Sequence, residues 1–264
     1  MLRIHDTPGR QGCADMRGGM RDLAGALRAI ERHPVGILLP AGGRLLAGVI
    51  SAMILVAIVR DEGAMQLRAD PVGFGGRLGV AWWALRIPQF AVELPFRGLM
   101  LAGGATAMGA PHHGPRLGPL LVVTAADALF RAGMGLLVGV PGLAAALFVI
   151  GTGWFATGLF LAAVSVLAAE LAAVAAGALL AGAPAEVVVG GRGGIAAIGA
   201  SLVQAPYAWL PRFAFLLVGD AVVAVGSLVC GAGALPGYPI AELAVLHHWL
   251  RRFDPARRLE DAHA

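Results

Sequence analysis

The run LAAALFVIGTGWFATGLFLAAVSVLAAELAAVAAGALLAG, residues 143–182, is almost continuously apolar and contains no proline. A helix needs about 20 apolar residues to cross a bilayer, so this run is long enough for two crossings. Only the tripeptide GTG at 151–153 indicates a break within it. We predict two spans, at 143–163 and 164–182, with one long helix as the alternative.

The whole chain shares this apolar character. Of its 264 residues 58% are hydrophobic and 14% are charged, and its mean hydropathy is +0.77. A soluble domain is about 25% charged. The sequence therefore predicts an all-α integral membrane protein, a polytopic helix bundle with about six spans. These spans are expected at residues 36–59, 87–110, 118–139, 143–163, 164–182 and 211–234.

Arginines gather near both ends of the chain, in the first 34 residues and again from residue 251 onwards. By the positive-inside rule this places both termini in the cytoplasm, although the arginines of 60–86 argue partly against it. We expect a cytoplasmic amphipathic segment at 1–34, a membrane domain at 35–238 and a second cytoplasmic amphipathic segment at 239–264. The predicted location is the inner membrane of a bacterium.

Two further patterns concern the surface of the bilayer. Leu23, Leu27 and Ile30 share one face of an expected surface helix. Residues 72–109 and 189–226 resemble each other, each having a glycine- and arginine-containing start, a tryptophan, a proline and then an apolar run. They predict an internal repeat in which a surface helix leads into a membrane helix.

Charged residues within the apolar spans are the candidate functional residues. Glu93 and Arg97 are four residues apart, as are Asp127 and Arg131, so each pair can neutralise itself on one helical face. Because the two pairs lie in consecutive spans, we predict one polar network of four charges that fixes helix packing. Glu170 and Asp220 have no such partner, and they are candidates for a proton or substrate path.

Catalytic and metal chemistry find little support. Cys13 and Cys230 are far apart in sequence and match no disulfide or zinc pattern. The histidine pairs at 112–113 and 247–248 are adjacent, whereas a helical metal site needs residues i and i+4 on one face. We interpret these histidines as interfacial, and we expect no catalytic residue, no metal and no cofactor.

Two family resemblances bear on function. The stretches LRAIERHPVGILLP (27–40) and GRGGIAAIGASLVQAPYAWLPRF (191–213) resemble the YIP1-like and glycerophosphodiester phosphodiesterase membrane-domain group, which implies a helical membrane domain without catalytic residues. The stretch VELPFRG (92–98) is similar to the Glu-Glu-x-x-x-Arg motif of the CPBP intramembrane proteases. Val92 stands at its first glutamate, and 118–234 contains no histidine, so no protease activity is expected.

We therefore expect a non-enzymatic membrane subunit or scaffold, whose partners are the lipid bilayer and other membrane proteins or a second copy of the chain. Abundant glycine and alanine favour such close helix packing. The alternative is a permease for a small solute or a proton that uses the intramembrane carboxylates. Nucleic acid is not an expected partner, because no basic surface interleaved with aromatic residues is present.

Overall fold

The computed structural model describes residues 8–69, 93–229 and 235–253, and all regular secondary structure in these ranges is helical. The predicted all-α fold class is confirmed. The helices are α1 (Pro8–Arg32), α2 (Pro34–Ala69), α4 (Leu117–Gly151), α5 (Phe155–Leu180), α6 (Ala183–Val188), α7 (Gly194–Val229) and α8 (Gly237–Phe253). One more helical stretch, residues 93–107, is called segment 93–107 below.

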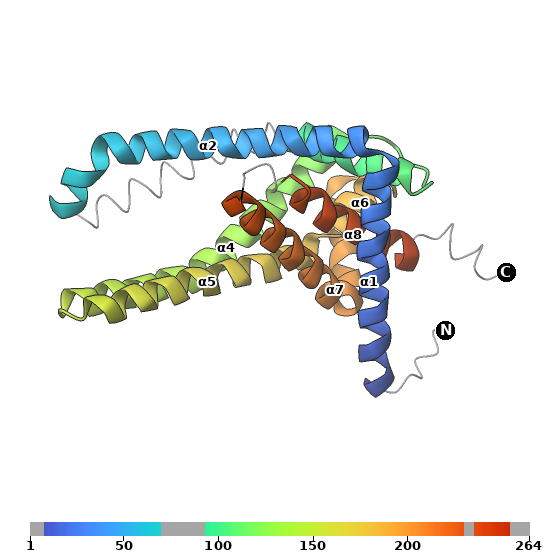
Figure 1. The fold of residues 1–264 in the computed structure, drawn as a ribbon. Helices are drawn as coiled ribbons and strands as arrows, with labels where there is room; N and C mark the ends of the chain where they lie inside the picture. Colours follow the sequence, from blue (N-terminus) through green and yellow to red (C-terminus); the bar gives the residue numbers. More distant parts are fainter. Residues whose placement is uncertain (1–7, 70–92, 230–234, 254–264) are drawn as a thin grey trace.

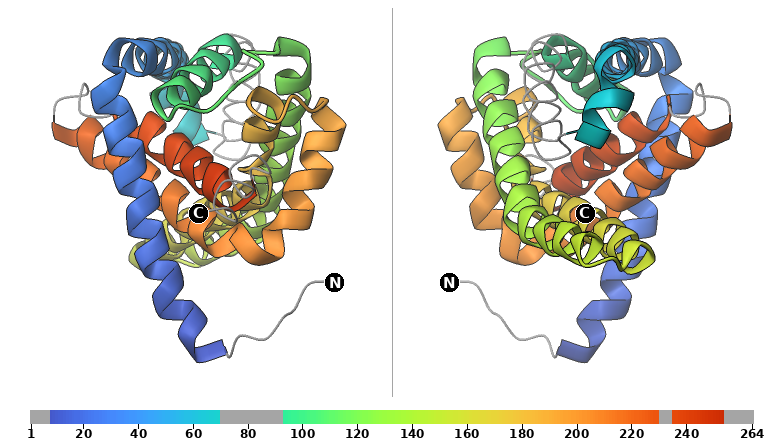
Figure 2. Two further views of the ribbon diagram at one scale, coloured as in Figure 1. Left: turned by 90° about the vertical axis from the view of Figure 1, so that its right-hand side faces the viewer. Right: turned by 90° about the vertical axis from the view of Figure 1, so that its left-hand side faces the viewer.

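Helix α8 lies within a cluster that also contains α1, α6 and α7 (Figure 1; Figure 2). Its apolar side chains are buried on several sides, and Leu243, Leu246 and Leu250 are completely inaccessible. The sequence pattern predicted that residues 239–264 would lie on a surface. The structure instead packs the described part of that range against α1 and α7 as a core helix.

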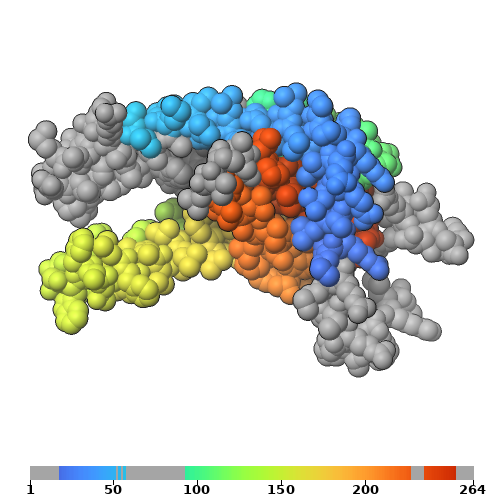
Figure 3. Space-filling view, viewed as in Figure 1, coloured from blue at the N-terminus to red at the C-terminus, as the bar shows by residue number. Residues whose placement is uncertain are grey.

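Helices α4 and α5 form a long antiparallel hairpin that extends away from this cluster (Figure 1). Small residues line its seam: a Cβ atom at Gly139 would lie 3.0 Å from Ala169 Cβ, and one at Gly158 would lie 2.9 Å from the carbonyl oxygen of Ala146. Small residues let membrane helices approach closely. The hairpin projects from the rest of the molecule (Figure 3). Its exposed side chains include the large apolar residues Leu129, Leu137, Phe148, Phe160 and Leu167.

Within residues 8–69, 93–229 and 235–253, four helices are long and apolar enough to cross a membrane, which supports the membrane assignment but does not confirm the count of six. They are Pro34–Ser51, Leu117–Gly151, Phe155–Val188 and Gly194–Gly226. Residues 118–182, expected to hold three spans, form only two helices. The expected boundaries at 140–142 and 163–164 are wrong, because α4 continues through Pro141 and α5 through residue 164.

The break falls instead at the GTG tripeptide. Thr152 and Gly153 donate backbone hydrogen bonds to carbonyls of the last turn of α4. Gly153 has a φ of 92°, a conformation that other residues rarely adopt. The glycine therefore allows the tight reversal that joins α4 to α5.

Helix α7 also differs from its expected form. The sequence predicted a surface helix followed by a span from residue 211, whereas α7 is one helix that continues through Pro206 and Pro211. The first half of the predicted repeat cannot be compared with it, because residues 72–92 lie outside the described residues. Cys230 and the chain ends at 1–7 and 254–264 lie outside them too.

Candidate functional site

The first cluster of buried charges is centred on Glu242 of α8. Its Oε1 lies 2.7 Å from Arg44 Nη1 of α2 and 3.2 Å from Arg97 Nε of segment 93–107. All three side chains are almost buried, with exposed fractions of 10–13%. The Arg44 guanidinium also lies over the ring of Tyr238, 5.0 Å from its centre. One carboxylate thus ties α8 to two other helices.

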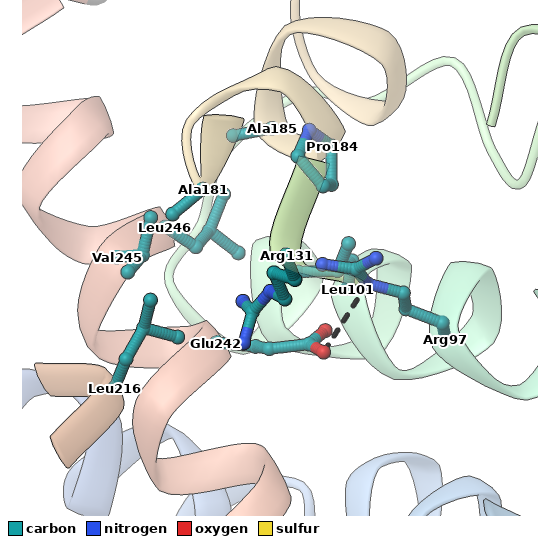
Figure 4. Close-up of a pocket in the computed structure, with 10 residues that line it drawn as sticks. All are labelled: Arg97, Leu101, Arg131, Ala181, Pro184, Ala185, Leu216, Glu242, Val245 and Leu246. Carbon is teal, nitrogen blue, oxygen red and sulfur yellow. Dashed lines mark ion pairs between the residues drawn. The ribbon is translucent and has the colours of Figure 1, made fainter. Parts of the chain in front are cut away.

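A small cavity adjoins this cluster (Figure 4). Its polar lining consists of Arg97, Arg131 and Glu242, and both arginines are turned towards the carboxylate. The volume is about 40 Å³. One water molecule needs roughly 10–15 Å³ of such space, so the cavity has room for a few waters and for no larger solute. The rest of the lining is apolar, consisting of Leu101, Ala181, Pro184, Ala185, Leu216, Val245 and Leu246.

The four residues of the predicted network lie on segment 93–107 and α4. Asp127 Oδ1 and Arg131 Nε are 3.0 Å apart, the expected contact within one helix. Arg97 Nη1 donates a hydrogen bond to Thr124 Oγ1 at 3.4 Å, which joins the segment to α4. Glu93 is half-buried and interacts electrostatically with Arg44. Glu242 lies beside Arg97 and Arg131, one arginine from each predicted pair, and it was not among the predicted network residues (Figure 4).

Glu170 and Asp220, the candidates for a proton or substrate path, lie on α5 and α7. The side chains of both residues are exposed. Asp220 interacts electrostatically with Glu170 and with Arg131. Arg131 therefore lies between the outer carboxylates and the inner cavity.

A sequence signal for the missed residues did exist. Arg44 is the only charged residue in the expected span 36–59, so it requires a partner from elsewhere in the chain. Glu242 precedes LAVL at 243–246. Four consecutive apolar residues indicate a helix that is buried on more than one face, not a surface helix. The pairing of Arg44 with Glu242 joins positions 198 residues apart, which no local spacing rule can detect.

The second cluster is centred on Asp22 of α1, which is completely buried. His247 Nδ1 lies 2.9 Å from Asp22 Oδ1, and His248 Nδ1 lies 2.8 Å from Oδ2. Arg251 donates from Nε to Oδ1 at 3.0 Å and from Nη2 to Oδ2 at 2.9 Å. These histidines were expected at a membrane interface. In the structure both contact the carboxylate of Asp22, which lies between α1 and α8.

Glycines on α1 make this contact possible. A Cβ atom at Gly18 would lie 3.0 Å from Arg251 Nη2, and one at Gly25 would overlap the ring of His247. Both glycines lie on the same helical face as Asp22, because they are four residues before it and three after it. The α1 sequence therefore combines one acid with two gaps that admit side chains from α8.

The ionisation of these groups follows from their surroundings. Burial alone would raise the pKa of Asp22, but hydrogen bonds from His247, His248 and Arg251 lower that pKa well below its ordinary value. Burial lowers the pKa of His248, and Asp22 only partly opposes this effect. Burial would likewise raise the pKa of Glu242, yet Arg44 and Arg97 keep it below the usual range. Both carboxylates are therefore ionised at neutral pH.

A third cluster surrounds Glu186 of α6, which is 3% exposed. Its Oε1 accepts hydrogen bonds from Gln204 Nε2 at 2.5 Å and from Trp249 Nε1 at 2.9 Å. Arg192 Nε lies 3.1 Å from Oε2. The amide of Gln204 also accepts a bond from the buried Arg212, 2.6 Å away. This cluster joins α6, α7 and α8.

Among the described residues, no group of three or more histidine, cysteine, aspartate or glutamate side chains could hold a metal ion. Comparison of the chain with protein-family models, curated proteins and solved structures finds no match.

Proposed function

We propose that the protein is a non-enzymatic subunit of the bacterial inner membrane, with both termini in the cytoplasm, that holds membrane-protein partners or a second copy of itself. The observation that carries this proposal is that its buried carboxylates are bonded across helices. Glu242 binds arginines from two helices, Asp22 joins α1 to α8, and Glu186 joins α6 to α7 and α8.

Such contacts favour a fixed architecture. Breaking a buried ion pair leaves an uncompensated charge, which typically costs about 3–5 kcal/mol. A transport cycle that opened α8 from α1 and α2 would have to break the contacts of Asp22 and of Glu242. The cavity of about 40 Å³ beside Glu242 is also too small for an organic solute.

The α4–α5 hairpin supplies a surface for partners or lipid. Its outer residues are large and apolar, and Phe148 and Phe160 are 74% and 67% exposed. The hairpin lies beside the cluster for only part of its length (Figure 1), so its outer part is available to another protein within the membrane.

One observation favours proton transfer as a second candidate function. The exposed carboxylates of Glu170 and Asp220 interact with Arg131 or with each other, and Arg131 reaches the inner cavity. These groups could relay a proton between the membrane-exposed surface and a few waters beside Glu242.

Neutral substitutions separate the two functions. In proteoliposomes, a scaffold should show no proton flux above that of protein-free vesicles, in the wild type and in Glu170→Gln and Asp220→Asn alike. A flux in the wild type that either variant abolishes without lowering the folded yield would replace the scaffold by the permease.

A second measurement addresses the partner surface. Phe160→Ala should reduce the mass of the detergent-extracted complex while leaving the folded yield unchanged. The matched control is Phe130→Ala, an exposed phenylalanine of α4 nearer the helical cluster. A wild-type particle with the mass of one chain would contradict the scaffold.

A further inference from the structure

A second cavity lies where the end of α1 meets segment 93–107 and α8. Its volume is about 120 Å³. Three of its lining residues are basic and none is acidic. The lining consists of Gly25, Arg28, Ala29, Arg32, Ala107, Met108 and His247.

The cavity has the size and shape for a small anion. Its walls include Ala29 and Ala107, whose small side chains leave space beside the arginines. An engineered protein cavity of about 150 Å³ holds benzene, so about 120 Å³ can accept a phosphate group. Guanidinium groups match phosphate geometry because their N–H groups form a planar fork.

Two of the basic side chains, Arg28 and His247, are held in place by contacts outside the cavity. Arg28 Nε donates to the carbonyl oxygen of Ala24 at 3.2 Å, which leaves its two terminal nitrogens outside that bond. His247 uses Nδ1 to contact the buried Asp22, 2.9 Å away. The ring edge that carries Nε2 lies against Gly25 at the cavity wall, because a Cβ atom there would overlap it. The Nε2 edge of His247 is therefore packed against α1, and the histidine acts as part of the cavity wall.

The cavity also lies close to the end of a membrane span. Arg32 ends α1, and the first candidate span begins two residues later at Pro34. Basic residues next to a span meet the phosphates of lipid headgroups, and each contributes about 1 kcal/mol to binding an anionic membrane surface.

We propose that this cavity binds a phosphate group through Arg28 and Arg32, with His247 forming part of its wall. The phosphate belongs either to an anionic lipid headgroup or to a free phosphate ion, and the chemistry of recognition is the same for both. This assignment is independent of the scaffold function proposed above.

The test uses the full chain in detergent, titrated with phosphatidylglycerol or with phosphatidylcholine, and native mass spectrometry counts the bound lipid. Arg28→Gln and Arg32→Gln should each weaken retention of phosphatidylglycerol about fivefold. Arg21→Gln, which removes an exposed charge from the same helix outside the cavity, should change retention less than twofold. Ala107→Phe should abolish retention of phosphatidylglycerol, because the larger side chain fills the cavity while every charge is kept.

Inorganic phosphate distinguishes the two sources. Loss of bound lipid on adding millimolar phosphate indicates a site for the free ion, whereas unchanged retention indicates a headgroup site. Equal retention of phosphatidylglycerol and phosphatidylcholine, with no effect of phosphate, would overturn the proposal. Equal losses in Arg21→Gln and in the cavity variants would overturn it as well, since the arginines would then act only as surface charge or as compensation for the α1 C-terminus.

Discussion

Arg252 of α8 donates a hydrogen bond from Nη1 to the backbone carbonyl oxygen of Tyr207 on α7, at 3.2 Å. In an uninterrupted helix this carbonyl would accept from the N–H of residue 211, but that residue is Pro211, which has none. The guanidinium therefore replaces the missing donor. This contact helps to explain why α7 continues through a proline that was expected to begin a separate span.

The first prediction follows from this substitution of donors. Arg252→Ala should lower the stability of the wild-type chain by about 1 kcal/mol, because it leaves the Tyr207 carbonyl without its side-chain donor. In a Pro211→Ala background the same change should cost clearly less, since the backbone then supplies an N–H. Thermal unfolding in detergent micelles, monitored by size-exclusion chromatography, measures the loss of stability in both backgrounds. Equal losses in the two backgrounds would show that the contact carries no such role.

The second prediction concerns Glu242, which serves two arginines. Glu242→Gln should lower stability by roughly 3–5 kcal/mol, because it leaves Arg44 and Arg97 buried without a carboxylate. Arg97→Met should cost less, since Glu242 then keeps Arg44. The triple variant Glu242→Gln, Arg44→Met, Arg97→Met should recover much of the folded yield.

The yield of folded protein in membranes measures this order. Glu31→Gln is the matched control, because Glu31 is an exposed glutamate on α1 and its loss should change little. A triple variant that folds no better than Glu242→Gln would mean that the cluster contributes something other than charge balance.

The sequence predicted the helical class and the membrane environment because composition and apolar length act over whole segments. It failed at boundaries that depend on a neighbour. Pro141 and Pro211 look like helix ends when only local bonding is considered, and α7 continues at Pro211 with a donor from α8. The GTG tripeptide was a local signal for a break, but the predicted boundary was placed at 163–164, and the positive φ of Gly153 shows where the chain reverses.

The candidate site shows the same division. Arg97 and Arg131 were identified from their spacing and line one cavity, but spacing within a helix cannot reveal a partner on another helix. Asp22 was treated as part of a surface helix, since nothing in its neighbourhood shows that three side chains from α8 surround it. That the network of Glu93, Arg97, Asp127 and Arg131 is structural remains a prediction.

The third prediction concerns pH and the contact between α1 and α8. Because the folded-state pKa of His248 is lowered, the unfolded chain takes up that proton first as the pH falls below about 6.5. Stability is therefore fully present above that pH and is lost below it. The other charged groups acting on His248 are Asp22, Arg212 and Arg252. The lowered pKa of Asp22 adds a further loss below about pH 4, where the unfolded carboxyl takes up its proton.

The neutral form of His248 explains the direction of this change. Its Nδ1 contacts Asp22, and its Nε2 is buried without a hydrogen-bond partner among the described residues. A proton on Nε2 would create an unpaired buried donor. The thermal unfolding midpoint should therefore decrease as the pH is lowered from 7.5 to 5.5. His248→Gln should make this decrease smaller. His112→Gln, an exposed control, should leave the decrease unchanged; a midpoint that rises on acidification would contradict the assignment.

The fourth prediction concerns a second carbonyl freed by a proline. Pro40 in α2 cannot donate to the carbonyl of Gly36, and that oxygen would lie 2.7 Å from a Cβ atom placed at Gly103. The bare backbone of Gly103 is thus what lets segment 93–107 approach α2. Gly103→Ala should force the two helices apart and lower stability by about 1–3 kcal/mol, the usual cost of overpacking. Gly133→Ala on α4 is the matched control, because a Cβ atom there meets nothing within 4 Å and alanine is the better helix former. The difference between the two thermal midpoints isolates the steric effect, and a Gly103→Ala midpoint at or above that of the control would show that the close approach is not needed.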